Sequence, residues 1–217
     1  MIIRHGQSTA NASGVWQGQM EFPLSEEGRR QARHTGRALS GEQIDAIYSS
    51  PLARAFETAE IIARETQFPG EVVSVPNLME RAGGSLEGTT VEQREAENPE
   101  LMERFLSIPE EERWTLVGAE TDEEVLERFE RGMAEILERH GAGERVLVVS
   151  HGGSMRAFLR EIFGPGALPG TQRVPNTSIT RIEWSTNGLR PRLLELASTA
   201  HLPDESAARL PIGDQAE

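Results

Sequence analysis

Cysteine is missing altogether from the 217 residues of this chain. Disulfide bonds and thiolate chemistry are therefore excluded, and a zinc site would need histidine and carboxylate ligands alone. Long apolar runs are missing too: none approaches the roughly 18–20 residues that a membrane-spanning helix needs. The N-terminus lacks the basic segment, apolar stretch and cleavage site of a signal peptide. We therefore expect a cytoplasmic protein with no membrane partner.

Positive charge is scarce: the chain holds 22 lysines and arginines against 35 acidic residues, a formal net charge of −13. A nucleic-acid partner is disfavoured, because phosphate backbones attract basic surfaces. A small anionic substrate is still compatible with this charge, because a few arginines in a cleft can dominate the field there. The composition is that of a globular protein. We expect one domain over residues 1–200 and a polar tail over residues 201–217.

Short apolar segments that resemble strands alternate with helical patterns along the chain. The strand-like segments are residues 1–3, 44–50, 71–75, 145–150, 178–184 and 191–197, and the helical ones are 24–40, 52–66, 121–140 and 154–164. Ser25 is a predicted N-cap, and Thr121 with Glu124 forms a predicted capping box. This alternation predicts an α/β three-layer sandwich with a mostly parallel central sheet, in which ligands bind beyond the carboxyl ends of the strands.

Residues 89–118 interrupt this pattern, because they are polar and punctuated by proline. They predict short helices, and we expect a lid insertion at about 85–120 that folds over the strand ends. This segment contains four large apolar side chains, those of Phe105, Leu106, Trp114 and Leu116. Two interpretations stay open for these four side chains: they anchor the lid, or they contact the substrate.

Two histidines occupy the same kind of position. His5 follows the apolar stretch "MII" and Arg4, His151 follows "RVLVVS", and each is followed by glycine. If the two strands are parallel neighbours, both imidazoles reach one edge of the sheet. Arg54 comes shortly after a third strand, so it is expected at the same edge. The other histidines, His34, His140 and His201, are interpreted as solvated or capping residues.

The residue types at this edge suit phosphoryl transfer. A neutral imidazole can attack phosphorus and carry the phosphoryl group covalently. Guanidinium groups bind phosphate oxygens in a bidentate manner, and the free N–H groups of a helix N-terminus also favour an anion. Such a site works by positioning and by stabilising charge on the equatorial oxygens. It needs no metal, and we expect no cofactor.

The stretch "RHGQSTAN" resembles the RHG[ET]xxxN motif of the histidine phosphatase superfamily, which includes cofactor-dependent phosphoglycerate mutases and small phosphomonoesterases. The segments "PLSEEGRRQA", "DAIYSSPLARAFETAEIIA", "LMERAGGSLEG" and "VLVVSHGGSMRAFL" match in the same order, and the resemblance covers roughly residues 2–184. The implied fold is phosphoglycerate mutase-like, with a short helical lid.

The resemblance also implies roles for individual residues. His5 would be the nucleophile, within a phosphate pocket formed by Arg4, Arg54 and His151. Glu80 would protonate the leaving oxygen and then activate water. The implied substrate-binding groups are Asn11, Gln17, Gly18 and the backbone of Gly152. Glu87 is a second nearby carboxylate that could share the acid role.

The implied function is a metal-independent phosphatase that hydrolyses small phosphate monoesters through a phosphohistidine. A phosphoglycerate mutase, which passes the phosphoryl group to another hydroxyl, is the alternative; a non-catalytic phospho-ligand binding module is a third. Three departures from the mutases favour hydrolysis: a shorter lid, Gly153 in place of asparagine, and Val15 where an arginine is frequent. The expected partner is a small phosphorylated metabolite, and a homodimer is left open.

Overall fold

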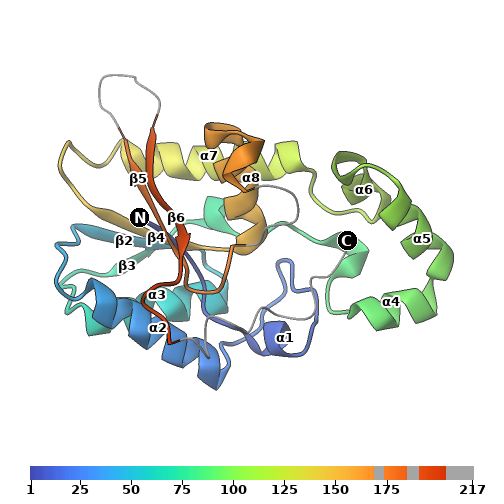
Figure 1. Cartoon of the computed structure of the whole chain (residues 1–217), viewed down its shortest axis with the longest axis horizontal. Helices are drawn as coiled ribbons and strands as arrows, with labels where there is room; N and C mark the ends of the chain where they lie inside the picture. The colour runs from blue at the N-terminus through green and yellow to red at the C-terminus, as the bar shows by residue number, and fades with distance from the viewer. Residues whose placement is uncertain (169–173, 185–190, 204–217) are drawn as a thin grey trace.

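The computed structural model describes residues 1–168, 174–184 and 191–203. Its centre is a six-stranded sheet with strand order β3-β2-β4-β1-β5-β6 (Figure 1). The strands are β1 (Ile2–Arg4), β2 (Ala46–Ser49), β3 (Val72–Ser74), β4 (Val146–Ser150), β5 (Ile179–Glu183) and β6 (Arg192–Ser198). Strands β1 to β4 pair in parallel, whereas β5 runs antiparallel to β1 and β6 antiparallel to β5. The predicted α/β fold with a mostly parallel sheet is confirmed.

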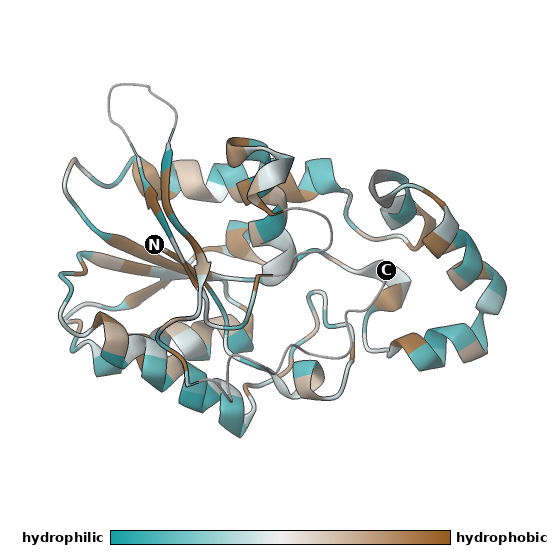
Figure 2. Cartoon of the chain, in the orientation of Figure 1, coloured by the Kyte–Doolittle hydropathy of each residue, from teal (hydrophilic) through white to brown (hydrophobic). Residues whose placement is uncertain are grey.

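Helices cover both faces of the sheet, as Figure 1 shows. Helices α2 (Glu26–Leu39) and α3 (Ala53–Glu65) lie on one face, and α7 (Asp122–Leu137) and α8 (Gly152–Phe163) lie on the other. Successive residues of a strand face opposite sides of the sheet. Ile2 therefore packs with Phe129 and Phe158 on one face, whereas Ile3 packs with apolar side chains of α3 on the other. Figure 2 shows the resulting hydrophobic strands between helices whose outer faces are polar.

Side-chain caps fix where the main helices begin. The Ser25 hydroxyl accepts a hydrogen bond from the Gly28 N–H at the start of α2. Thr121 and Glu124 form the predicted capping box of α7. Gly164, at the end of α8, has φ of 84°, a conformation that glycine adopts without steric cost. One short helix, α1 (Thr9–Ala12), was not predicted from the sequence.

Three short helices lie within residues 85–120, as the sequence predicts; we call this range the lid segment, and its role as a lid stays a prediction. They are α4 (Val91–Glu97), α5 (Pro99–Ser107) and α6 (Glu110–Leu116). They lie at the far end of the molecule from β5 and β6 (Figure 1). Their apolar side chains form a cluster of their own, separate from the two clusters at the sheet: Leu86, Met102, Phe105, Trp114, Val117 and Ala119. Leu106, in contrast, is 41% exposed.

Two histidines differ from their predicted solvated or capping roles. The Nε2 atom of His140 forms a hydrogen bond with the Tyr48 hydroxyl at 3.0 Å. The Nδ1 atom of the same ring lies 2.7 Å from a carboxylate oxygen of Glu144. His201 lies half-buried with Nε2 at 3.0 Å from the Thr35 hydroxyl. Tyr48 and Thr35 come from distant parts of the chain, so local sequence carried no signal for these two contacts, whereas Glu144 is only four residues from His140. The remainder of the expected tail, from residue 204 onward, lies outside the described residues.

Three single-turn 3-10 helices complete the description: η1 (Pro76–Leu78), η2 (Gly84–Leu86) and η3 (Pro165–Ala167). Within the ranges that the structure describes, no helix combines the length and the apolar character needed to cross a bilayer.

Candidate active site

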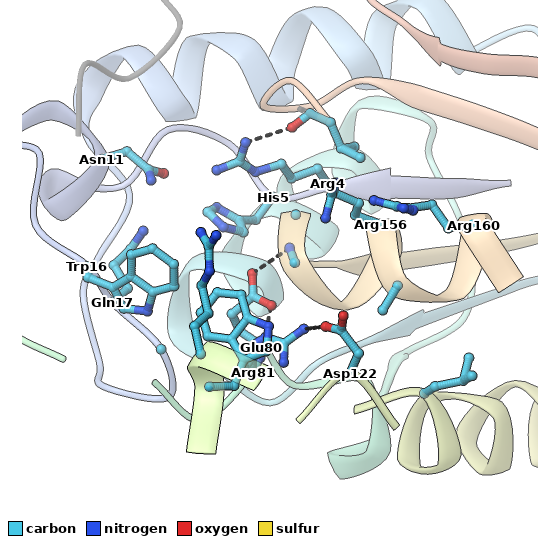
Figure 3. A pocket seen from close by; sticks show the side chains of 18 of the residues that line it. Arg4, His5, Asn11, Trp16, Gln17, Glu80, Arg81, Asp122, Arg156 and Arg160 are labelled. Carbon is cyan, nitrogen blue, oxygen red and sulfur yellow. Dashed lines mark hydrogen bonds and ion pairs between the residues drawn. The ribbon is translucent and has the colours of Figure 1, made fainter. Parts of the chain in front are cut away.

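The parallel pairing of β1 with β4 brings the two predicted histidines together. Arg4 and Ser150 are register partners, and the His5 N–H donates to the Ser150 carbonyl at 2.9 Å. The next residue on each strand therefore reaches the same edge, and the His5 and His151 ring centroids are 5.1 Å apart. Figure 3 shows His5 beside Arg4 at the centre of the cavity that this edge borders.

The tautomer of His5 follows from its hydrogen bond. Nδ1 lies 2.6 Å from the Gly6 carbonyl oxygen, which can only accept, so Nδ1 carries the proton. Nε2 then holds a free electron pair. Burial, followed by the charges of Arg54 and Arg4, holds the pKa of His5 well below its usual value of 6.5. The imidazole is therefore neutral at pH 7 and available as a nucleophile.

Arg54 is a fully buried guanidinium held by backbone carbonyls. Its Nη1 and Nη2 donate to Met20 at 2.9 Å and to Gly18 at 2.7 Å. Its Nε is buried and has no hydrogen-bond partner among the described residues. Burial lowers the pKa of Arg54 to about 10, so the group stays charged at pH 7. An unsatisfied buried N–H is costly, and an anion in the cavity would satisfy it. Arg4 donates to the Val174 carbonyl at 2.6 Å.

His151 is the second buried imidazole. Its Nε2 lies 2.7 Å from the Ser50 hydroxyl, and its Nδ1 is buried without a hydrogen-bond partner in the described part of the chain. Burial, then the charges of Arg54, His5 and Arg4, lowers the pKa of His151 well below 6.5. Two neutral imidazoles thus lie within the influence of the same two guanidinium groups.

Glu80 lies against the N-terminus of α8. Its Oε2 accepts from the Gly153 N–H at 3.0 Å, and its Oε1 accepts from the Ser154 N–H at 2.9 Å. The same Oε1 also accepts from the Ser154 hydroxyl at 3.1 Å and from the backbone N–H of Arg81 at 2.9 Å. These donors and the positive end of the helix dipole fit an ionised carboxylate. A side chain on Gly153 would collide with it, since an added Cβ would lie 2.7 Å from Oε1.

Asn11, in α1, and Gln17, in the loop that follows α1, reach the cavity. The Asn11 side-chain oxygen accepts from the Ser8 N–H at 3.2 Å, and the Gln17 oxygen accepts from the Ser8 hydroxyl at 2.7 Å. Neither NH2 group donates to another residue within the described ranges, so each is a donor for a ligand. Both side chains line the cavity.

Glu87 has a different environment from Glu80. Its Oε1 accepts from the Gln19 N–H at 2.9 Å and from the Gly83 N–H at 2.6 Å. Gly18 (φ +49°) passes so close that an added Cβ would lie 1.9 Å from that oxygen. Glu87 therefore ties two loops together. It does not line the cavity, which favours Glu80 over Glu87 for the acid role.

Eight of the nine predicted site residues line one cavity of about 620 Å³. The ninth, His151, is fully buried next to His5 and does not line it. Sequence analysis missed several other residues that line it: Trp16, Arg81, Arg113, Asp122, Glu123, Arg156, Arg160 and Glu161. Trp114 and Phe105 pack within the cluster of the lid segment and also line the cavity, so their anchoring role is confirmed and their contact with substrate stays a prediction. Val15 borders the same space.

In the ranges that the structure covers, no cluster of three or more histidine and carboxylate side chains is placed to hold a metal ion.

Comparisons with known proteins agree with this geometry. Residues 1–197 match the model of the histidine phosphatase superfamily (branch 1). A metal-independent phosphoserine phosphatase of Arabidopsis thaliana is 39% identical over 163 residues, 75% of this chain and 67% of that protein. A 2,3-bisphosphoglycerate-dependent phosphoglycerate mutase of Parvibaculum lavamentivorans is 34% identical over 75% of this chain and 78% of its own.

One similar solved structure is a mycobacterial glucosyl-3-phosphoglycerate phosphatase in complex with VO3. It superimposes with a TM-score of 0.72 at 29% identity, covering 91% of this chain and 98% of the mycobacterial one.

Proposed function

Because this chain belongs to the histidine phosphatase superfamily, we propose that it hydrolyses small phosphate monoesters through a phosphohistidine on His5. The observation that carries the proposal is the state of His5: Nδ1 donates to the Gly6 carbonyl, and Nε2 is left unprotonated in a cavity lined by Arg4 and Arg54. A neutral nucleophile held beside fixed cations is what attack on a phosphate dianion requires.

In the first step, Nε2 of His5 attacks phosphorus while the bond from phosphorus to the ester oxygen breaks. Arg4, Arg54, His151 and the Gly152 N–H receive the phosphoryl oxygens. Arg54 Nε has no hydrogen-bond partner among the described residues, and this step would give it one. His151 Nδ1 is a further donor in the tautomer in which His151 Nε2 accepts from the Ser50 hydroxyl. Glu80, as the carboxylic acid, gives its proton to the leaving oxygen, and the alcohol departs.

In the second step, Glu80 is the carboxylate that its hydrogen-bond donors already fit. It takes a proton from water as the water oxygen attacks phosphorus. The bond from Nε2 to phosphorus breaks, and its electron pair returns to the imidazole. Inorganic phosphate leaves, and Glu80 holds the proton for the next cycle.

The mutase alternative shares the first step and differs in the acceptor. A mutase must keep water from the phosphohistidine while the intermediate turns round. Gly153 supplies no side chain that could grip such an intermediate, and Glu80 occupies the space where one would begin. Val15, which also lines the cavity, carries no charge. These two features favour water as the acceptor, and the phosphatase relative supports the same choice.

The proposal is tested by phosphate release from a panel of esters and by trapping the intermediate. We expect His5→Ala to abolish turnover, and the wild-type protein, quenched in base during turnover, to carry acid-labile phosphate. His34→Ala, at a half-exposed position of α2, is the matched control and should keep both properties. Turnover that persists in His5→Ala would overturn the phosphohistidine mechanism.

A further inference from the structure

Glu80, the proposed proton donor, lies on a stretch of chain that is neither helix nor strand. The 3-10 helix η1 ends at Leu78, and the next one, η2, begins at Gly84. The backbone N–H and C=O groups of such a stretch have no partners in a helix or a sheet, so other groups must bind them. The position of Glu80 therefore depends on the groups that bind the backbone around it.

The guanidinium group of Arg128, on α7, binds three of the four consecutive backbone carbonyls of residues 77–80. Its Nη1 donates to the carbonyls of Asn77 at 3.0 Å and Met79 at 2.9 Å, and its Nη2 donates to that of Glu80 at 3.3 Å. The fourth carbonyl accepts from a serine hydroxyl at the end of β4 at 2.8 Å. One side chain from a distant helix thus binds most of the backbone that leads to Glu80.

The rest of the Arg128 guanidinium group binds the carboxylate of Glu120, the last residue of the lid segment. Nε donates to Oε1 at 3.0 Å and Nη2 donates to Oε2 at 2.9 Å, which is the paired geometry of an arginine and a carboxylate. Together with the three carbonyls, this carboxylate occupies all five N–H donors of the guanidinium group. The Arg128 side chain is only 12% exposed, and such a buried charge is tolerated when its donors are bonded.

Glu120 binds the backbone on the other side of Glu80. Its Oε2 accepts from the Ala82 N–H at 2.7 Å, and its own N–H donates to the Ala82 carbonyl at 2.8 Å. Ala82 comes two residues after Glu80, so the backbone is bound both before and after the proposed acid. We call the pair of Arg128 and Glu120 the clamp.

The clamp does not line the cavity, whereas Glu80 does. The carboxylate of Glu80 accepts from the N–H groups of Gly153 and Ser154 at the start of α8. Helix α8 therefore binds the carboxylate, and the clamp binds the backbone from which that carboxylate projects. An effect of the clamp on proton transfer would reach the substrate through Glu80.

We propose that Arg128 is a positioning residue for the proton transfer by Glu80. With Glu120, it fixes the backbone of residues 77–82 so that the carboxyl group stays within reach of the leaving oxygen. A general acid must lie within hydrogen-bond distance of the atom that it protonates, and a displacement of about 1 Å can lower a rate by about 10²-fold. This inference rests on the proposed function, since it takes Glu80 as the acid.

The dependence of kcat on the leaving group tests this role in the full-length protein. Arg128→Gln removes the charge and most of the donors. We expect kcat for alkyl phosphates to fall by about 10²-fold, and kcat for aryl phosphates, whose leaving groups need little protonation, to fall by less than about tenfold. KM should change little for either ester, because Arg128 lies outside the cavity. A merely structural role would lower both rates by the same factor.

A double-mutant cycle with Glu80→Gln shows whether the effect passes through the acid. Once the acid is gone there is no proton to position, so adding Arg128→Gln should lower kcat for alkyl phosphates by no more than about twofold. If the two residues acted independently, the two losses would multiply.

Arg131→Gln is the matched control, because it makes the same substitution at an exposed arginine of the same helix. It should keep both rates. Arg128→Lys provides the test if Arg128→Gln does not fold, since it keeps a positive charge opposite Glu120 but offers three donors in place of five. We expect the same selective loss on alkyl phosphates, smaller in size. Thermal melting checks that each variant is folded.

The outcomes separate this inference from the proposed function. If Glu80→Gln slows alkyl phosphates selectively but the folded Arg128 variants slow both ester types equally, the positioning role is wrong and the phosphatase assignment stands. The positioning role is also wrong if the two losses multiply in the double mutant, or if Glu80→Gln itself shows no selectivity. If the wild type hydrolyses no ester, p-nitrophenyl phosphate included, the proposed function fails, and this inference with it.

Discussion

The imidazole rings of His5 and His151 lie with their centroids 5.1 Å apart and their planes inclined by 56°. Both rings are buried beside the same two guanidinium groups, and burial and positive charge lower both pKa values. Protonating either ring would place a third buried cation in this cluster. The arrangement therefore keeps His5, the proposed nucleophile, neutral and links folding to pH.

The first prediction is a loss of stability in mild acid. In the unfolded chain both histidines titrate near pH 6.5, whereas in the folded protein both stay neutral well below that value. Below pH 6.5 the unfolded state thus binds more protons, so stability falls as pH falls, by about 1.4 kcal/mol per pH unit for each histidine. Urea unfolding at a series of pH values measures this slope.

The His5→Gln variant isolates one of the two histidines. Its unfolding free energy should fall less steeply with acid, by about 1.4 kcal/mol per pH unit relative to the wild type. His34→Gln is the control, because this half-exposed side chain lies away from the cluster. Identical slopes for the wild type and His5→Gln would contradict the neutral, buried state of His5.

The second prediction concerns Glu80 as the proton donor. Glu80→Gln keeps the shape of the side chain but removes the acid, so esters of alcohols with a high pKa should slow by about 10²–10⁴-fold. Aryl phosphates, whose leaving groups need little protonation, should slow less. The measurement is kcat for both ester types, with Glu87→Gln for comparison. Equal losses on both would indicate that Glu80 has a structural role only.

The third prediction uses the space between Gly153 and Glu80. A Cβ at residue 153 would lie 2.7 Å from the Glu80 Oε1, so Gly153→Ala should displace the carboxylate from the start of α8. We expect a loss on alkyl phosphates that follows the pattern of Glu80→Gln, with a smaller loss on aryl phosphates. Gly166→Ala is the control, because nothing lies within 4 Å of its added Cβ. Full alkyl phosphatase activity in Gly153→Ala would show that this docking is dispensable.

The fourth prediction is that catalysis needs no divalent metal. The charge on the phosphoryl oxygens is met by Arg4, Arg54 and backbone N–H groups in the proposed mechanism, so a chelator should leave the rate nearly unchanged. Vanadate, which mimics five-coordinate phosphorus, should inhibit competitively. Activity that disappears with chelator and returns with Mg²⁺ would refute this.

The fifth prediction is that hydrolysis exceeds mutase activity. With 3-phosphoglycerate and catalytic 2,3-bisphosphoglycerate in one reaction, phosphate release should be faster than formation of 2-phosphoglycerate. The physical reason is that no side chain at Gly153 and no charge at Val15 holds a turning intermediate away from water. Isomerisation that is faster by about tenfold, or about 1.4 kcal/mol in barrier height, would establish the mutase alternative.

The sequence predicted the centre of the site because its signal is local. His5, His151 and Arg54 each follow a strand, and the parallel sheet brings strand ends together. Arg156 and Arg160 were not found, because a charged residue on a helix is usually solvated. Their spacing from Gly152 was the available signal, but it becomes informative only once the helix is known to line a cavity.

Asn176 shows a second reason why part of the site could not be predicted from the sequence. Its side chain donates to the His5 carbonyl at 2.9 Å, and it lies in the turn before β5. Nothing near residue 176 in the sequence points to a histidine at residue 5. The same applies to Tyr48 with His140, since polar contacts between distant segments depend on the completed fold.

The lid segment packs on a core of its own, and this gives the protein two levels of stability. Its helices depend on one small apolar cluster, whereas the sheet is buried by two larger ones. A unit with few buried contacts opens at a lower free energy than the whole domain. Amide hydrogens of α5 and α6 should therefore exchange with solvent well before those of β1 and β4. Product could leave through such an opening while the strand ends that hold His5 and His151 stay in register.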